Sequence, residues 1–93
     1  MLVIIKSAPD TTDGARGLTL AKEGGGDIIL LQNGVYFAQK ERLGIFPGAV
    51  YVLNDDMRLR GINDSELDAR AKTIDYDTLT DIITGDDKVV GLF

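Results

Sequence analysis

The run Ile28-Ile29-Leu30-Leu31 is apolar at every position, and two further runs share its pattern, Leu2-Val3-Ile4-Ile5 and Val50-Tyr51-Val52-Leu53. The three runs are short, contain many β-branched residues, and are apolar at consecutive rather than alternate positions. Strands that are buried on both faces of a parallel sheet have this pattern. We therefore predict three parallel strands at the centre of an α/β domain.

The segments between these runs have the lengths of crossover helices. Residues 10–23 form the first predicted helix. Residues 33–43 form the second, with Asn33 as its cap and Gly44 as its end. Residues that typically cap, begin or end helices also follow the third run. We expect a helix from Asn54 to Arg60, a capped turn over residues 63–71, a weak strand over 72–74, a helix over 75–84 and a fifth strand over 88–93.

The order of these elements predicts one domain, residues 1–93, with the fold class α/β. We expect a small three-layer α/β/α domain of the flavodoxin-like type, with right-handed crossovers and a mostly parallel sheet of four or five strands. For residues 88–93, a tail docked on the domain is the alternative to a strand. In the last helix, Tyr76, Leu79, Ile82 and Ile83 lie within an arc of about 120° and are expected to face the core.

The composition excludes several classes of function, because the chain has no Cys, no His and no Trp. It therefore has no thiolate nucleophile, no Ser-His or Cys-His pair and none of the usual zinc ligands except carboxylates. Ten basic and 15 acidic residues give a net charge of −5, which disfavours direct binding to nucleic acid. The apolar runs are far shorter than the roughly 20 residues that span a bilayer, so we expect no membrane partner and a cytoplasmic location.

Four glycine or acidic motifs resemble known sites but lack their context. Gly24-Gly25-Gly26 precedes a strand instead of following one, so it is interpreted as a flexible connection and not as a phosphate-binding loop. Asp55-Asp56 is interpreted as helix capping, because no acidic partners for magnesium follow the first strand. The acidic residues of 75–77 and 86–87 lack the spacing of a calcium loop. We predict no metal site and no cofactor.

Gln32-Asn33-Gly34 follows the second strand, at the sheet edge where α/β folds bind ligands. A side-chain amide and the free N–H groups of a helix start can bind a small anion there. The alternative is a cap and a tight turn without a ligand. Both interpretations stay open on the sequence.

Aromatic residues on the second predicted helix bear on association. Val35, Ala38 and Leu43 share one side of this helix, with Tyr36 at its margin, whereas Phe37 lies on the opposite side and is expected to be exposed. Aromatic residues are enriched at protein interfaces. With the apolar end of the chain at Phe93, this pattern predicts partner contacts through Phe37, Phe93 and Tyr36, and a subunit of an oligomer.

Taken together, the motifs resemble the TusB/DsrH family of sulfur-relay proteins over nearly the whole chain. Three stretches carry the resemblance: ILLQNGVY at residues 29–36, VYVLNDD at 50–56 followed by Arg60-Gly61, and IDYD at 74–77 with Asp81 and Lys88.

The resemblance implies a DsrEFH-like fold and an assembly with DsrE/TusD-like and DsrF/TusC-like subunits. Such complexes pass persulfide sulfur toward the 2-thio group of tRNA wobble uridine, or serve sulfur oxidation. Some members of the family carry a cysteine, and this chain has none. The resemblance therefore implies a structural, non-catalytic subunit. The alternatives are a stand-alone homo-oligomer of other function and a small-anion-binding module.

Overall fold

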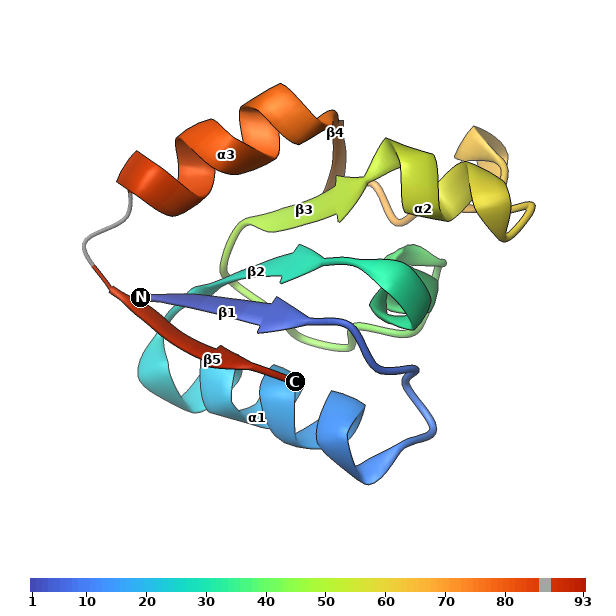
Figure 1. Ribbon diagram of the computed structural model, residues 1–93. Helices are drawn as coiled ribbons and strands as arrows, with labels where there is room; N and C mark the ends of the chain where they lie inside the picture. Colours follow the sequence, from blue (N-terminus) through green and yellow to red (C-terminus); the bar gives the residue numbers. More distant parts are fainter. Residues whose placement is uncertain (86–87) are drawn as a thin grey trace.

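Five parallel strands form one sheet in the computed structural model, which describes residues 1–85 and 88–93. The strands are β1 (Leu2–Ile5), β2 (Asp27–Leu30), β3 (Val50–Leu53), β4 (Ala71–Ile74) and β5 (Val89–Leu92). Their order in the sheet is β4-β3-β2-β1-β5, so the first three predicted strands lie side by side at its centre (Figure 1). The fourth and fifth strands are confirmed as well, and every pair of neighbours is parallel.

Helices cover both faces of the sheet, which confirms the three α/β/α layers. The helical elements are α1 (Thr12–Gly24), the 3-10 helix η1 (Gln32–Ala38), α2 (Asn54–Leu59), the 3-10 turn η2 (Asp64–Glu66) and α3 (Tyr76–Gly85). In Figure 1, α1 lies on one side of the strands and α3 on the other. The structure thus has the predicted α/β class, with a sheet that is parallel throughout. Its strand order, β4-β3-β2-β1-β5, differs from the 2-1-3-4-5 order of flavodoxin.

The core is divided by the sheet into a larger and a smaller part. The larger part packs on the α1 side, around Val3, Ile28 and Val50 together with Phe37 and Phe46. The smaller part lies on the α3 side, where Leu2, Ile29 and Leu53 meet Leu79. Alternate residues of each central strand point into opposite parts, which is why the strand sequences are apolar without alternation.

The second predicted helix is shorter than residues 33–43 and is of the 3-10 type. After Ala38 the chain turns to pair with residues 66–68 instead. Gln39 forms an antiparallel bridge with Leu67, and the N–H of Lys40 donates to the carbonyl oxygen of Glu66 at 2.9 Å. These long-range bonds occupy the backbone groups that would continue the helix. The predicted turn over 63–71 is likewise reduced to η2, although its capping box of Asn63 and Glu66 is confirmed.

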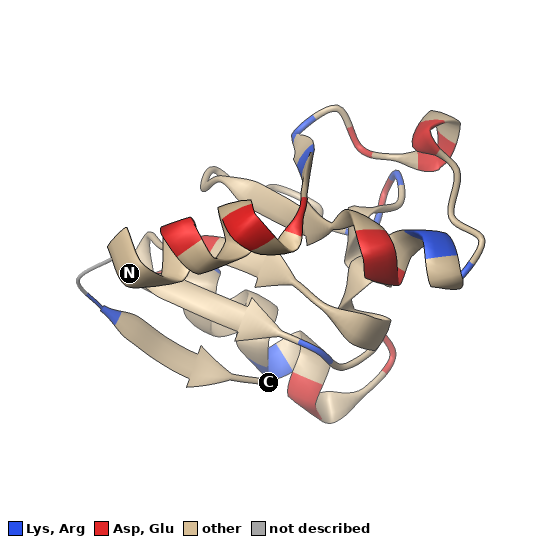
Figure 2. Ribbon diagram, turned by 45° about the horizontal axis from the view of Figure 1, so that its top comes forward, with Lys and Arg blue, Asp and Glu red and all other residues tan. Residues whose placement is uncertain are grey.

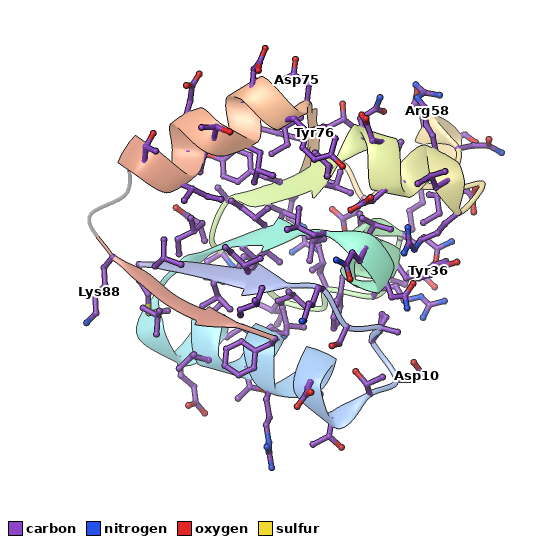
Figure 3. The ribbon with its side chains drawn as sticks, in the orientation of Figure 1. Asp10, Tyr36, Arg58, Asp75, Tyr76 and Lys88 are labelled. Atoms are coloured by element: carbon purple, nitrogen blue, oxygen red, sulfur yellow. The ribbon has the colours of Figure 1, made fainter. Side chains whose placement is uncertain are left out.

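The inward stripe of the last helix is only partly correct. Leu79 is buried and Ile82 and Ile83 are half-buried, but Tyr76 is 55% exposed. Tyr76 is the first residue of α3, two residues after the end of β4 (Figure 3). The interpretation of Asp86 and Asp87 as surface charge lies outside the described residues.

Arg70, just before β4, holds the loop that follows η1. Its guanidinium group donates to the carbonyl oxygens of Gly44 and Phe46 at 2.9 and 3.2 Å. The same group donates to both carboxylate oxygens of Asp68, at 2.9 and 2.7 Å. This side-chain hydrogen bonding lowers the pKa of Asp68 from 3.8 to about 2. The carboxylate therefore orients an arginine that fixes the buried Phe46.

The lowered pKa makes the contribution of Asp68 to the stability of the protein dependent on pH. A carboxyl group with a depressed folded-state pKa stabilises the protein above its unfolded pKa, and this stability is lost as the pH falls toward the folded value. We expect Asp68→Asn to lower the free energy of unfolding at neutral pH, because it removes the carboxylate that Arg70 contacts. The loss should be only about 1 kcal/mol, because Arg70 is partly exposed and solvent screens the pair. Urea unfolding from pH 7 to pH 2 measures this. If Asp68→Asn lowered the free energy of unfolding by the same amount at every pH, the lowered pKa of Asp68 would be contradicted.

Candidate functional site

The turn after β2 lies at the carboxyl edge of the sheet and is tied to α2. Gln32 has a positive φ of 48°, so its backbone turns sharply as it leaves the strand. The N–H of Gln32 donates to the Oδ2 atom of Asp56 at 2.6 Å. This bond joins the exit of β2 to the first turn of α2.

Asn33 makes a second connection between the turn and α2. Its Oδ1 atom accepts a hydrogen bond from Nε of Arg60 at 2.9 Å, and Nη1 of Arg60 donates to the carbonyl oxygen of Asp56 at 3.1 Å. The prediction that Asn33 caps a helix is therefore wrong. The cap position is Leu31, without a side-chain bond, and the Asn33 amide is instead part of an Asn33–Arg60–Asp56 network.

The turn has few backbone donors left for a ligand. The N–H of Gly34 donates to the carbonyl oxygen of Leu31 at 2.8 Å, and that of Gln32 is bound to Asp56. An external anion at Gln32 would have to displace this carboxylate and approach its negative charge. The structure brings Gln32, Asn33 and Gly34 together with Asp56 and Arg60, and anion binding by this turn stays a prediction.

The expectation that Phe37 is exposed is wrong. Its side chain is 3% exposed and belongs to the larger core, beside Val35 and Ala38. The error follows from the helix type, because a 3-10 helix has three residues per turn and places its side chains differently from an α-helix. Because its side chain is buried, Phe37 cannot contact a partner in this structure.

Tyr36 and Phe93 are both half-buried against the larger core. Phe93 follows β5, where its N–H donates to the carbonyl oxygen of Ile4 at 2.8 Å and its carbonyl accepts from the Ser7 hydroxyl. Its ring lies at Gly17 of α1, where an added methyl group would come within 3.0 Å of the Phe93 Cβ atom. Tyr36 lies at the η1 end of the sheet, far from α1 (Figure 3). The structure does not bring the three predicted contact residues together.

Several other apolar residues are exposed, and the sequence analysis did not predict that three of them lie on one strand. Val89, Val90 and Leu92 are 43%, 36% and 61% exposed, and all three belong to β5. Ile45 and Leu59 are exposed singly, on a loop and on α2. A run that is apolar at every position predicts a strand, but only the strand order shows that this strand is at an edge.

The site chemistry is limited to carboxylates, amides, arginine and tyrosine. Within residues 1–85 and 88–93, no group of three or more carboxylates is arranged to hold a metal ion. Across the same residues, none of the helices has the length and apolar character needed to span a bilayer. The arrangement at the carboxyl edge is a hydrogen-bonded structural joint between β2 and α2.

Comparison with known proteins gives the family. The model of the DsrH-like protein family matches residues 6–89 of the chain. The solution NMR structure of protein Tm0979 from Thermotoga maritima is similar at 27% identity, with a TM-score of 0.69, over 97% of this chain and 98% of that one. None of the curated proteins matches the chain. Because the family model covers most of the sequence and the fold agrees, the chain belongs to the family of DsrH-like proteins.

Proposed function

We propose that this protein is a non-catalytic subunit of a sulfur-relay complex of the TusBCD or DsrEFH type. The observation that carries the proposal is a DsrH-like family match over residues 6–89 in a chain without cysteine. The partners in this proposal are a DsrE/TusD-like and a DsrF/TusC-like subunit. The process is the 2-thiolation of tRNA wobble uridine in the cytoplasm.

The lack of cysteine assigns the chemical step to a partner. In transpersulfidation, an acceptor thiolate attacks the outer sulfur of a donor persulfide, a new S–S bond forms, the old S–S bond breaks, and the donor leaves as a thiolate. No other side chain of this protein can hold the sulfur atom in this way. The DsrE-like subunit therefore carries the sulfur in the proposal, and this chain positions or stabilises that subunit.

The charge of the surface is consistent with an indirect role in tRNA modification. The net charge is −5, and Figure 2 shows acidic residues along α3, whereas α2 carries both acidic and basic residues. Such a surface repels the phosphate backbone. Binding of tRNA is therefore assigned to other members of the complex.

Deletion of the gene in its own cells tests the process. We expect 2-thiouridine at the wobble position, measured by mass spectrometry of digested tRNA, to fall severalfold, and expression of the wild-type chain to restore it. Complementation with Leu59→Ala serves as a surface control and should restore it equally. Unchanged 2-thiouridine with the protein absent would contradict the role in tRNA thiolation.

A further inference from the structure

The turn that leaves β2 contains the single Asn-Gly pair of the chain, Asn33-Gly34. An asparagine followed by glycine loses its side-chain amide more readily than any other, because glycine has no Cβ atom to shield its backbone nitrogen and its backbone is the most adaptable. The other two asparagines, Asn54 and Asn63, each precede an aspartate, which makes the same reaction slow. Asn33 is exposed, so water and hydroxide can reach its amide group.

The reaction that removes this amide proceeds through a cyclic succinimide. The backbone nitrogen of Gly34 loses its proton and attacks the side-chain carbonyl carbon of Asn33. A new C–N bond forms, the bond to the side-chain nitrogen breaks, and that nitrogen takes up the proton and leaves as ammonia. Water then opens the ring. Attack of water on the side-chain carbonyl carbon gives aspartate, and attack on the backbone carbonyl carbon gives isoaspartate.

The attacking nitrogen is withheld in the folded protein. The N–H of Gly34 donates to the carbonyl oxygen of Leu31 at 2.8 Å, so its proton is not free for removal by hydroxide. Gly34 is also buried against β1, where an added methyl group would lie 2.7 Å from the carbonyl carbon of Ile5. Its backbone therefore has little room to rotate toward the Asn33 side chain, and the turn must open before the ring can close.

The attacked amide group is held by the end of α2. The Oδ1 atom of Asn33 accepts a hydrogen bond from Nε of Arg60 at 2.9 Å. This bond holds the amide toward Arg60 and restricts the side-chain rotation that ring closure needs. Figure 1 shows the turn after β2 and α2 at the same end of the sheet, so the contact joins two elements that are distant in sequence.

Asp56 restrains both sides of Asn33. Its Oδ2 atom accepts from the N–H of Gln32 at 2.6 Å, and its carbonyl oxygen accepts from Nη1 of Arg60 at 3.1 Å. It thus holds the residue before Asn33 directly and the Asn33 amide through Arg60. Its carboxylate also disfavours the negative charge that appears on the Gly34 nitrogen when the proton leaves. Both effects slow the reaction.

We propose that Asn33 is a site of spontaneous deamidation, and that the joint between β2 and α2 sets the rate of this modification. The reaction occurs only in molecules whose turn has opened, so its rate follows the population of the open turn. The proposal is independent of the sulfur-relay function.

The two products have different consequences for the joint. Aspartate at position 33 keeps the normal backbone and places a carboxylate beside the guanidinium group of Arg60, so the joint can form again. Isoaspartate adds a methylene group to the backbone just before Gly34, which already packs tightly against Ile5. The turn cannot close around the longer backbone. Formation of isoaspartate is therefore a one-way change that leaves the joint open.

Ageing of the purified protein tests the site. The protein would be kept for weeks at neutral pH, and mass spectrometry of its peptides would measure amide loss at Asn33, with Asn54 and Asn63 as internal references. We expect loss at Asn33 in the folded protein, and loss at least about tenfold faster in urea, because unfolding frees the Gly34 N–H. Equal rates in the two conditions, or no loss from the folded protein, would overturn the proposal. Loss in urea no faster at Asn33 than at Asn54 would also overturn it.

Removal of the Asp56 carboxylate tests control by the joint. Asp56→Ala should lose the Asn33 amide about fivefold faster than the wild type, which is the effect of a lost charge-assisted hydrogen bond on the opening of the turn. Asp55→Ala is the matched control, since it makes the same change at the exposed neighbouring residue of α2, and it should age at the wild-type rate. Circular dichroism would confirm that both variants are folded. Equal rates for the two variants would overturn control by the joint.

Asn33→Asp separates the new charge from the longer backbone. This variant has the charge of the product and a normal backbone, so it should melt close to the wild-type temperature. The isoaspartate form, enriched from aged wild-type protein by chromatography, should melt lower and should lose amide-exchange protection at Gln32. If Asn33→Asp melted as low as the isoaspartate form, the one-way change of the backbone would be overturned.

Discussion

Phe37→Ala is expected to lower the free energy of unfolding by about 3–5 kcal/mol, which is the usual cost of removing a buried aromatic ring. The side chain is 3% exposed and packs in the core between η1 and the sheet. A domain of this size has a total stability of about 5–14 kcal/mol. The variant should therefore unfold at a much lower urea concentration than the wild type, or fail to fold.

An exposed apolar residue provides the control for Phe37. Ile45 is 91% exposed on the loop after η1. Ile45→Ala should change stability by no more than about 0.5 kcal/mol. If Phe37→Ala were as stable as Ile45→Ala and only lost its ability to associate, Phe37 would be a surface contact and its place in the core would be incorrect.

Gly34→Ala is expected to destabilise the protein by about 3 kcal/mol or more. Gly34 follows the β2 exit and lies directly against the end of β1. A methyl group there would overlap the carbonyl oxygen of Ile5 and lie 2.7 Å from its carbonyl carbon. These are backbone atoms of a central strand, so they cannot move without disturbing the sheet. The Gln32–Asp56 and Asn33–Arg60 bonds would be displaced with the turn.

Gly85→Ala is the matched control for this substitution. Gly85 ends α3, has no neighbouring atom within 4 Å of an added methyl group, and should tolerate alanine or become slightly more stable. Thermal unfolding of the two variants measures the difference. Similar melting temperatures for Gly34→Ala and the wild type would show that the turn is not packed against β1 as described.

The strands could be predicted because their signal is local. The runs at residues 2–5, 28–31 and 50–53 are apolar at consecutive positions, and this pattern depends only on burial of both faces. The strand order could not be predicted, because it depends on where the crossover through α3 returns the chain. It returns beside β1, so Val89 and Leu92 form an edge and are not central.

The candidate site was predicted less well because long-range contacts determine it. The apolar and capping pattern of residues 33–43 is consistent with an α-helix, and only the pairing of Gln39 with Leu67 ends it early. This change from an α-helix to a 3-10 helix moves Phe37 from the predicted surface into the core. Asn33 has the side chain of a cap, but its Oδ1 atom instead accepts a hydrogen bond from Nε of Arg60, 27 residues later.

Native co-purification tests whether the chain is a subunit of a sulfur-relay complex. The chain would be tagged at its own genomic locus, recovered from intact cells and examined by quantitative mass spectrometry. We predict stoichiometric recovery of a cysteine-bearing DsrE-like protein together with a DsrF-like protein. Recovery of the chain alone, or only with further copies of itself, from cells that express it well would contradict its role as a subunit of a sulfur relay.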